Sequence, residues 1–129
     1  MTDARERYAV EPRRVEKPWG WELVWAEADD YVGKLLFVRA GEALSLQYHE
    51  RKDESWLVQE GRARLELGDI GGELEPVEIY AGDAFRFRPG TLHRVTALED
   101  TLVVEVSTPH LDDVVRLEDR YGREGTSAP

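Results

Sequence analysis

The chain has 129 residues, a length that fits one domain, and 17 Lys and Arg against 27 Asp and Glu give it a formal net charge of −10. A surface this acidic argues against nucleic acid or an anionic membrane as the main partner, because both attract positive charge. The lack of cysteine excludes disulfides, thiolate metal ligands and cysteine nucleophiles. The sequence contains no signal peptide and no apolar run of membrane-spanning length, so we expect a cytoplasmic protein.

Short apolar segments recur along the chain between Gly- and Asp-containing turns. Most of them alternate apolar and polar side chains with a period of two, which is typical of strands with one buried face. In chain order, the sequence predicts strands at residues 21–25, 34–39, 43–48, 55–59, 62–67, 77–80, 84–87, 94–97 and 102–107. Many short strands without a long helix indicate an all-β sandwich or closed barrel.

The two ends of the chain are expected to lie outside this domain. Residues 1–14 and 124–129 are predicted to be loose tails, which leaves residues 15–123 as a single domain. The stretch 111–118 favours a short helix. The neighbouring acidic pair Asp112 and Asp113 is interpreted as part of a solvated loop.

Two of the three histidines lie in a pattern that suits a metal site. Gln47 and His49 are two residues apart on a predicted strand and therefore share a face. Glu54 opens the next strand, and His93 follows a Pro-Gly turn further along the chain. Two imidazoles, a carboxylate and an amide oxygen suit a borderline divalent metal with open positions, without choosing among zinc, manganese, iron, nickel and cobalt. Either histidine alone could equally be a surface or hydrogen-bonded core residue, so the combined spacing carries the hypothesis.

This spacing resembles the two motifs of the cupin superfamily, whose positions are filled here by Gly41, Gln47, His49, Glu54 and Gly61, and then by Gly82, Pro89, Gly90 and His93. The Gln47 variant and the blocks at 17–21, 44–49, 54–56 and 112–123 are similar to type II phosphomannose isomerases. In that family this cupin is commonly the C-terminal domain of a bifunctional enzyme with a mannose-1-phosphate guanylyltransferase. Two departures stand out, because Gln47 replaces the usual leading histidine and Lys52 stands in the place of an arginine.

The resemblance implies a small antiparallel β-barrel or jelly roll, the double-stranded β-helix of cupins. It implies one divalent metal ion, zinc by first choice, held by Gln47, His49, Glu54 and His93. The implied reaction is the metal-dependent isomerisation of a sugar phosphate, mannose 6-phosphate to fructose 6-phosphate. Cupin-like chains are often dimers, so a homodimer is expected. The altered turn around Lys52 leaves enzymatic activity open. The alternatives are a cupin that binds a sugar or sugar nucleotide without catalysis, and a metal-dependent dioxygenase.

An isomerase would also need a base and a cation for the phosphate. Lys34 is the candidate base because it aligns with a lysine of the family and lies on a largely apolar strand face; alternatively, it lies at a strand end and reaches water. Arg88 or Arg116 is the candidate phosphate contact. Arg88 lies on the strand face opposite Phe85 and Phe87, and either face could point into the barrel.

Overall fold

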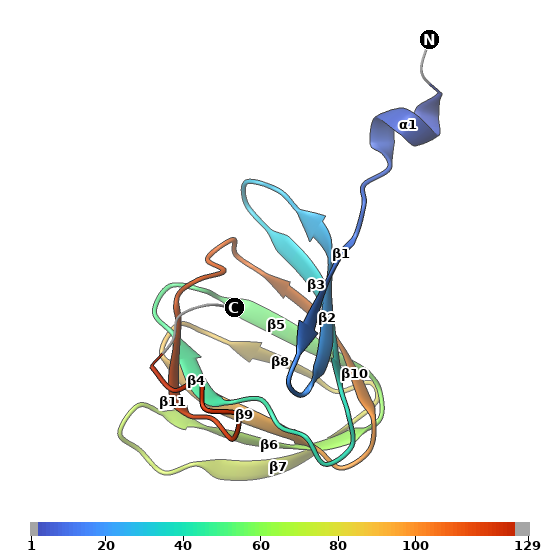
Figure 1. Ribbon diagram of the computed structural model, residues 1–129. Coiled ribbons are helices and arrows are strands. Elements are labelled where there is room, and N and C mark those ends of the chain that lie inside the picture. Colours follow the sequence, from blue (N-terminus) through green and yellow to red (C-terminus); the bar gives the residue numbers. More distant parts are fainter. Residues whose placement is uncertain (1–2, 126–129) are drawn as a thin grey trace.

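The computed structural model describes residues 3–125, which form two antiparallel sheets closed into a barrel, with a short helix outside it (Figure 1). One sheet has the strand order β1-β2-β3-β10-β5-β8 and the other β11-β4-β9-β6-β7. The elements are α1 (Ala4–Tyr8), β1 (Arg13–Lys17), β2 (Gly20–Glu27), β3 (Val32–Val38), β4 (Leu46–His49), β5 (Glu54–Glu60), β6 (Arg62–Asp69), β7 (Glu75–Tyr80), β8 (Ala84–Phe87), β9 (Thr91–Ala97), β10 (Thr101–Ser107) and β11 (Val114–Glu118). The all-β prediction is confirmed, and each predicted strand overlaps one of these.

The core lies between the two sheets and follows the predicted alternation. Val58 and Val103 from the six-stranded sheet meet Leu65, Ile79 and Val95 from the five-stranded sheet, and all five are almost fully buried. Each such side chain contributes about 1.5–3 kcal/mol through its burial. The intervening residues of β6, such as the arginine at 64, point to solvent.

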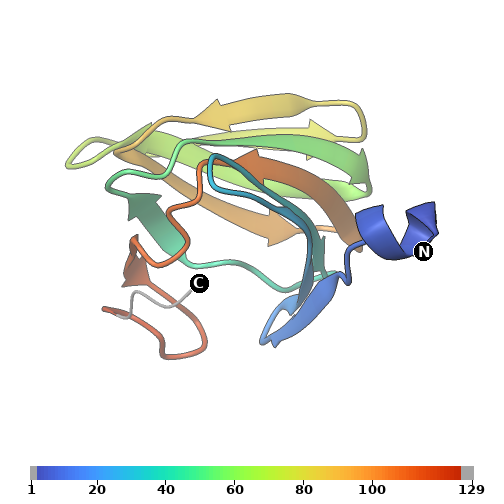
Figure 2. The ribbon, with the colours of Figure 1, turned by 90° about the horizontal axis from the view of Figure 1, so that it is seen from above.

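The short strand β4 lies at one end of the barrel, between β9 and β11. β4 pairs with β9 where Gln47 lies opposite His93, and its other edge is covered by β11. Figure 2 shows β4 (teal) and β11 (orange-red) together at one side of the barrel. This end therefore gathers the strands that carry the candidate ligands, because only four residues separate the end of β4 from the start of β5.

The predicted helix at 111–118 is wrong, because Val114–Glu118 is strand β11. It pairs antiparallel with β4, with Val114 opposite His49 and Arg116 opposite Gln47. Two consecutive β-branched valines and the open edge of β4 favour a strand over a short helix here.

The expected tails are partly structured. α1 and the first residues of β1 fall within residues 1–14, and β1 pairs along its whole length with β2. The tail expected at 124–129 lies mostly outside the described residues. Between residues 3 and 125, no helix is both long and apolar enough to cross a membrane.

Gly61 lies in the turn between β5 and β6. Among the glycines of the predicted turns, it has the least space for a side chain. Its φ of 98° lies in the left-handed region, and an added Cβ would overlap the carbonyl oxygen of Asp100 and lie 2.7 Å from the Cα of Thr101. Gly82 has nearly the same φ, 96°, but an added Cβ would meet open space.

This contrast gives a prediction about stability. Gly61→Ala should lower the free energy of unfolding by about 3 kcal/mol or more, because the strain of a positive φ adds to the overlap of the new Cβ with residues 100–101. Gly82→Ala should lower it by about 1 kcal/mol, because only the positive φ is unfavourable there. Urea denaturation of both variants measures the difference. Equal losses would contradict the close approach of Gly61 to residues 100–101.

Candidate metal centre

Three buried side chains meet at the end of the barrel where β4, β5 and β9 come together. His49 ends β4, Glu54 opens β5 and His93 lies within β9. One ligand atom from each lies within 4.8 Å of the other two, so these three residues could hold a metal ion. The structure thus brings together three of the four predicted ligands as a compact His–Glu–His group.

Both imidazoles use Nδ1 for a hydrogen bond, which leaves Nε2 of each ring available to a metal. His93 Nδ1 lies 3.0 Å from the carbonyl oxygen of Thr91 and His49 Nδ1 lies 3.1 Å from Asp113 Oδ1, and both partners can only accept. Each Nδ1 therefore carries the proton, and each Nε2 presents a lone pair to the centre. Burial is the main reason that the pKa of His49 falls to about 4, which keeps this ring neutral at neutral pH.

The carboxylate of Glu54 completes the group. Its Oε1 lies 3.1 Å from His93 Nε2 and 3.7 Å from His49 Nε2. Glu54 Oε1 and His93 Nε2 are fully buried, and neither has a hydrogen-bond partner among the described residues. Buried polar atoms are rarely left in this state, and a divalent ion between these donors would satisfy both. The residues present therefore fit a metal.

The position of Gln47 is compatible with the fourth ligand role, which stays a prediction. Its Oε1 accepts a hydrogen bond of 2.6 Å from Ser45 Oγ, and its Nε2 lies 3.5 Å from His49 Nε2. A hydroxyl can accept as well as donate. Rotating the amide would keep the contact with Ser45 and turn Oε1 toward the centre.

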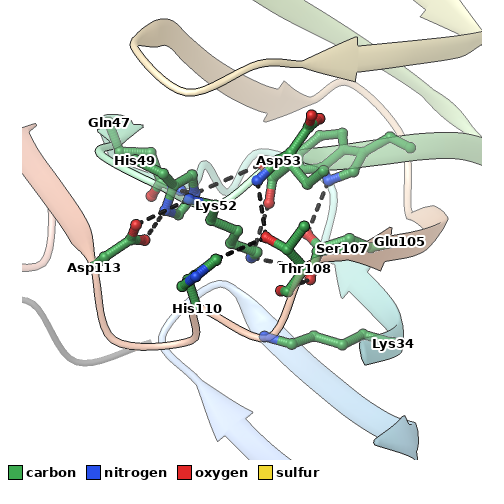
Figure 3. Close-up of polar contacts among 12 residues, drawn as sticks. Lys34, Gln47, His49, Lys52, Asp53, Glu105, Ser107, Thr108, His110 and Asp113 are labelled. Carbon is green, nitrogen blue, oxygen red and sulfur yellow. Dashed lines mark hydrogen bonds and ion pairs between the residues drawn. The ribbon is translucent and has the colours of Figure 1, made fainter. Parts of the chain in front are cut away.

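A second buried layer, in which Lys52 meets Glu105 (Figure 3), holds the carboxylate of Glu54 in place. Lys52 Nζ lies 2.8 Å from Glu54 Oε2 and 3.3 Å from Glu105 Oε2, and Trp56 Nε1 donates to Glu105 Oε1 at 2.9 Å. Burial opposes the charge of Lys52, but the carboxylates of Glu105 and Glu54 outweigh it and raise its pKa. Burial likewise raises the pKa of Glu54, but the ammonium of Lys52 outweighs this and holds it well below its usual range. Lys52 thus occupies one carboxylate oxygen and leaves Oε1 for the centre.

The centre opens into a cavity of about 520 Å³, counting the part that reaches solvent. Its wall combines apolar and aromatic side chains with an excess of cations. The charged lining residues are Lys17, Lys34, Lys52, Arg116 and Arg123 against Glu22, Glu54 and Glu105. Positive charge is therefore concentrated in the cavity of a chain whose net charge is −10.

Of the three predicted cationic residues, two line this cavity. Lys34 is buried on β3, where its Nζ lies 3.5 Å from Glu22 Oε1, and Arg116 is buried on β11. Arg88 is exposed and lines a different hollow, because Phe87 points into the core instead. The structure thus brings Lys34 and Arg116 to the site and leaves Arg88 outside it.

Asp113 was missed, because the sequence interpretation placed it in a solvated loop. Its Oδ1 accepts a hydrogen bond from the Nδ1–H of His49 (Figure 3), and its Oδ2 accepts hydrogen bonds from the backbone N–H groups of Arg51 and Lys52 at 2.7 and 3.0 Å. Asp113 therefore orients a candidate ligand and also fixes the turn before Glu54. Its place inside the family-like block at 112–123 is the signal that could have found it.

Comparison with known proteins supports the cupin fold and identifies the family. The family model described as "Mannose-6-phosphate isomerase C-terminal" matches residues 3–119. Among solved structures, KdgF of a Halomonas species is similar with a TM-score of 0.65 and 26% identity, over 78% of this chain and 88% of that one. A cupin superfamily protein of Desulfitobacterium hafniense has a TM-score of 0.58 and 15% identity, over 67% of this chain and 74% of that one. The expected cupin barrel is confirmed.

Curated relatives carry a different activity in their names from the one expected. A mannose-1-phosphate guanylyltransferase of Escherichia coli is 37% identical over 125 residues, which are 94% of this chain and 25% of the relative. Other relatives bear the same name. The chain thus spans about a quarter of the length of the curated relatives it matches.

These names correct the expected function. The prediction of a mannose 6-phosphate to fructose 6-phosphate isomerase is wrong, because the relatives are named for guanylyl transfer and the matching family model describes a C-terminal domain. The role of Lys34 as the isomerase base falls with it. Lys34 remains a buried cation of the cavity wall.

The contact between Asp113 and His49 gives a prediction about metal affinity. Asp113→Ala should weaken zinc binding about 10- to 100-fold, because groups that orient a ligating histidine have effects of this size. Asp112→Ala is the matched control, since Asp112 is exposed. Competition with a chromophoric chelator measures both affinities, and equal affinities for the two variants would contradict the orienting role.

The position of Lys52 gives a prediction about metal-free stability. Lys52→Met should destabilise the metal-free chain by about 3–5 kcal/mol, because it leaves the carboxylates of Glu54 and Glu105 buried without a cation. Added zinc should recover more of the stability of Lys52→Met than of the wild type, since the ion supplies the missing charge. Denaturation with and without a chelator measures this. Lys52→Arg keeps the charge, so an equal loss in both variants would contradict the electrostatic role.

Proposed function

We propose that this chain, which belongs to the mannose-6-phosphate isomerase C-terminal family, is a metal-dependent binding domain for a phosphorylated mannose. We infer that it serves mannose-1-phosphate guanylyl transfer in GDP-mannose synthesis, the activity for which its relatives are named. The observation that carries the proposal is the cavity, where a His–Glu–His group adjoins five cationic side chains. The cytoplasmic location expected from the sequence stays a prediction.

The charge of the cavity supports an anionic ligand. Its five cationic side chains exceed its three carboxylates, and a divalent ion, when bound, adds two positive charges and polarises a ligand oxygen. The overall field of the chain repels anions, so an excess of cations inside one cavity has to attract the ligand locally. A phosphate group has the charge that this cavity favours.

Arg116 is the residue that we assign to the phosphate. It lies on β11, next to the strand that carries Gln47 and His49, and its side chain lines the cavity. A guanidinium offers forked donors that match phosphate oxygens, which a lysine ammonium does not. Burial and the neighbouring Arg123 lower the pKa of Arg116, and the negative charge of an anionic ligand would offset both effects.

The remainder of the wall suits a sugar. Trp19, Leu36, Leu44 and Trp56 line the same cavity as the charged groups. Sites for small molecules usually combine such apolar walls with a few convergent polar groups, in cavities of about 300–1,000 Å³. The ring of a hexose has apolar faces and polar edges, so it fits this combination.

The relatives support the link to guanylyl transfer. Their similarity covers nearly the whole of this chain but only a quarter of theirs, so the same domain accompanies a larger part in those proteins. A domain that holds a phosphorylated mannose beside a transferase would retain the substrate or product of that reaction. We propose this role for the present chain, in either the same or a separate polypeptide.

Calorimetric titration with mannose 1-phosphate and with GDP-mannose tests the proposal. Binding should occur in the presence of zinc or manganese and weaken in His93→Ala, which removes a metal ligand. Arg116→Gln should weaken binding at least tenfold, because a charge-assisted hydrogen bond contributes about 1.5–3 kcal/mol. Arg88→Gln is the matched control, since Arg88 is exposed outside the cavity.

Two results would overturn the proposal. One is failure of both ligands to bind with either metal. The other is an equal effect of Arg116→Gln and Arg88→Gln, which would place the phosphate outside this cavity. Unphosphorylated mannose should bind more weakly than mannose 1-phosphate. Equal affinities would contradict the proposed contact between the cavity and the phosphate group.

A further inference from the structure

A β-bulge in β2 separates Trp25 from the regular pairing of the sheet. Val24 lies opposite Lys34 of β3, and the next paired residue, Ala26, lies opposite Gly33. Trp25 between them is therefore an extra residue without a partner of its own. Bulges of this kind redirect a side chain, and they are common at sheet edges and beside active sites.

The indole ring of Trp25 lies over the backbone of Gly33. A Cβ added to Gly33 would lie 2.9 Å from Cζ2 and 3.0 Å from Cε2 of the ring. Gly33 alternates with the inward-facing Val32 and Lys34 and so faces outward, yet it is buried, because the ring covers it. Trp25 itself remains 43% exposed. The glycine thus lets an aromatic ring lie against the sheet while part of the ring stays open to solvent.

A hollow beside this ring has the size of a small-molecule site. It measures about 780 Å³, counting the part that reaches solvent, and lies between the N-terminal arm, the end of β2 and the loop before β3. Tyr31 in that loop supplies a second aromatic ring and is 57% exposed. Within residues 3–125, the hollow shares none of its lining residues with the cavity of the metal centre. We call it the Trp25 hollow.

Charge distinguishes the Trp25 hollow from the metal cavity. Its charged lining residues are Glu11, Arg13 and Glu27. Arg13 Nη2 lies 3.5 Å from Glu27 Oε1, so these two charges balance and the carboxylate of Glu11 sets the net charge of the hollow. Together with the net charge of −10, this carboxylate repels a phosphorylated ligand. The hollow therefore favours a ligand without phosphate.

We propose that the Trp25 hollow is a second binding site, which takes the ring of an unphosphorylated hexose, free or as a unit of a glycan. The C–H face of such a ring is apolar and packs against the indole of Trp25 and the phenol of Tyr31. Its hydroxyl groups both donate and accept hydrogen bonds, so they suit the carboxylate of Glu11 and the guanidinium of Arg13 equally. This site depends neither on the metal nor on the phosphorylated ligand proposed above.

Proton–nitrogen NMR of the full chain tests the proposal, because each of the four tryptophans gives its own indole N–H signal. The probes are methyl α-mannoside and an α-linked mannotriose, added up to about 50 mM with a chelator present, a range that covers weak sites. The indole signal of Trp25 should shift, whereas those of Trp19 and Trp56 in the metal cavity should stay. Tighter binding of the mannotriose would identify a glycan as the source of the ring, and equal affinities a free hexose. Mannose 1-phosphate should shift Trp25 less than methyl α-mannoside does, the opposite order to that proposed for the metal cavity.

Two variants test the seat of the ring. Trp25→Leu should weaken binding about 10-fold, because an apolar side chain remains but the aromatic ring is lost; the loss is then followed through the signals of the sugar. Gly33→Ala should weaken binding about 2- to 10-fold, because the new methyl group displaces the ring. The displaced atoms belong to an exposed side chain, so circular dichroism should show an unchanged fold. Gly72→Ala is the matched control, since Gly72 is exposed in the turn between β6 and β7.

Four results would overturn the proposal. One is a Trp25 signal that neither sugar shifts. Another is an equal effect of Gly33→Ala and Gly72→Ala on binding. The third is tighter binding of choline than of either sugar at Trp25, which would make the hollow a site for organic cations. The fourth is a shift confined to Trp19 and Trp56, which would place the sugar in the metal cavity and leave the proposed function standing.

Discussion

The burial of one carboxylate, that of Glu54, is the constraint on which the rest of the site depends. Glu54 is only 2% exposed, at the start of a strand inside an all-β barrel. An ionised carboxylate in such a place is several kcal/mol too costly unless positive charge and hydrogen bonds surround it. Lys52 supplies a full charge on one oxygen, and the two imidazoles face the other. Oε1 remains buried without a hydrogen-bond partner, and the free-energy cost of this state favours the binding of a cation beside it.

The same constraint explains why buried charges extend beyond the candidate ligands. Lys52 needs a second carboxylate, Glu105, and Glu105 in turn takes the indole N–H of Trp56. On the next strands, Glu22 lies between Lys34 and Lys17 at 3.5 and 3.9 Å. Each charged side chain is thus tolerated because its neighbour is charged. A polar network of this kind fills a region that other barrels fill with apolar side chains, and it leaves a cavity whose wall can bind a charged ligand.

Much of the fold was predictable from the sequence because it depends on local patterns. The period-two alternation located the nine strands from β2 to β10, and the sequence spacing predicted that His49, Glu54 and His93 would meet, while the ligand role of Gln47 stays a prediction. β11 was missed, because two consecutive valines alone do not distinguish a short strand from a short helix, and the edge of β4 that β11 covers is formed by residues far away in the sequence. The role of Asp113 was hidden for the same reason, since it reaches His49 only after β11 has docked. Parity could not say whether Arg88 or Phe87 points into the barrel, and the burial of Phe87 places Arg88 outside it.

The contact between His49 and Asp113 joins residues that are 64 positions apart in the chain. A ribosome delivers residues in order, so Glu54 and His93 leave it well before Asp113 does. Until then β4 has an uncovered edge, and the ring of His49 has no acceptor to fix its tautomer. β11 therefore finishes the centre, and the nascent chain reaches its full affinity for a metal only after Asp113 has been synthesised and β11 has paired with β4.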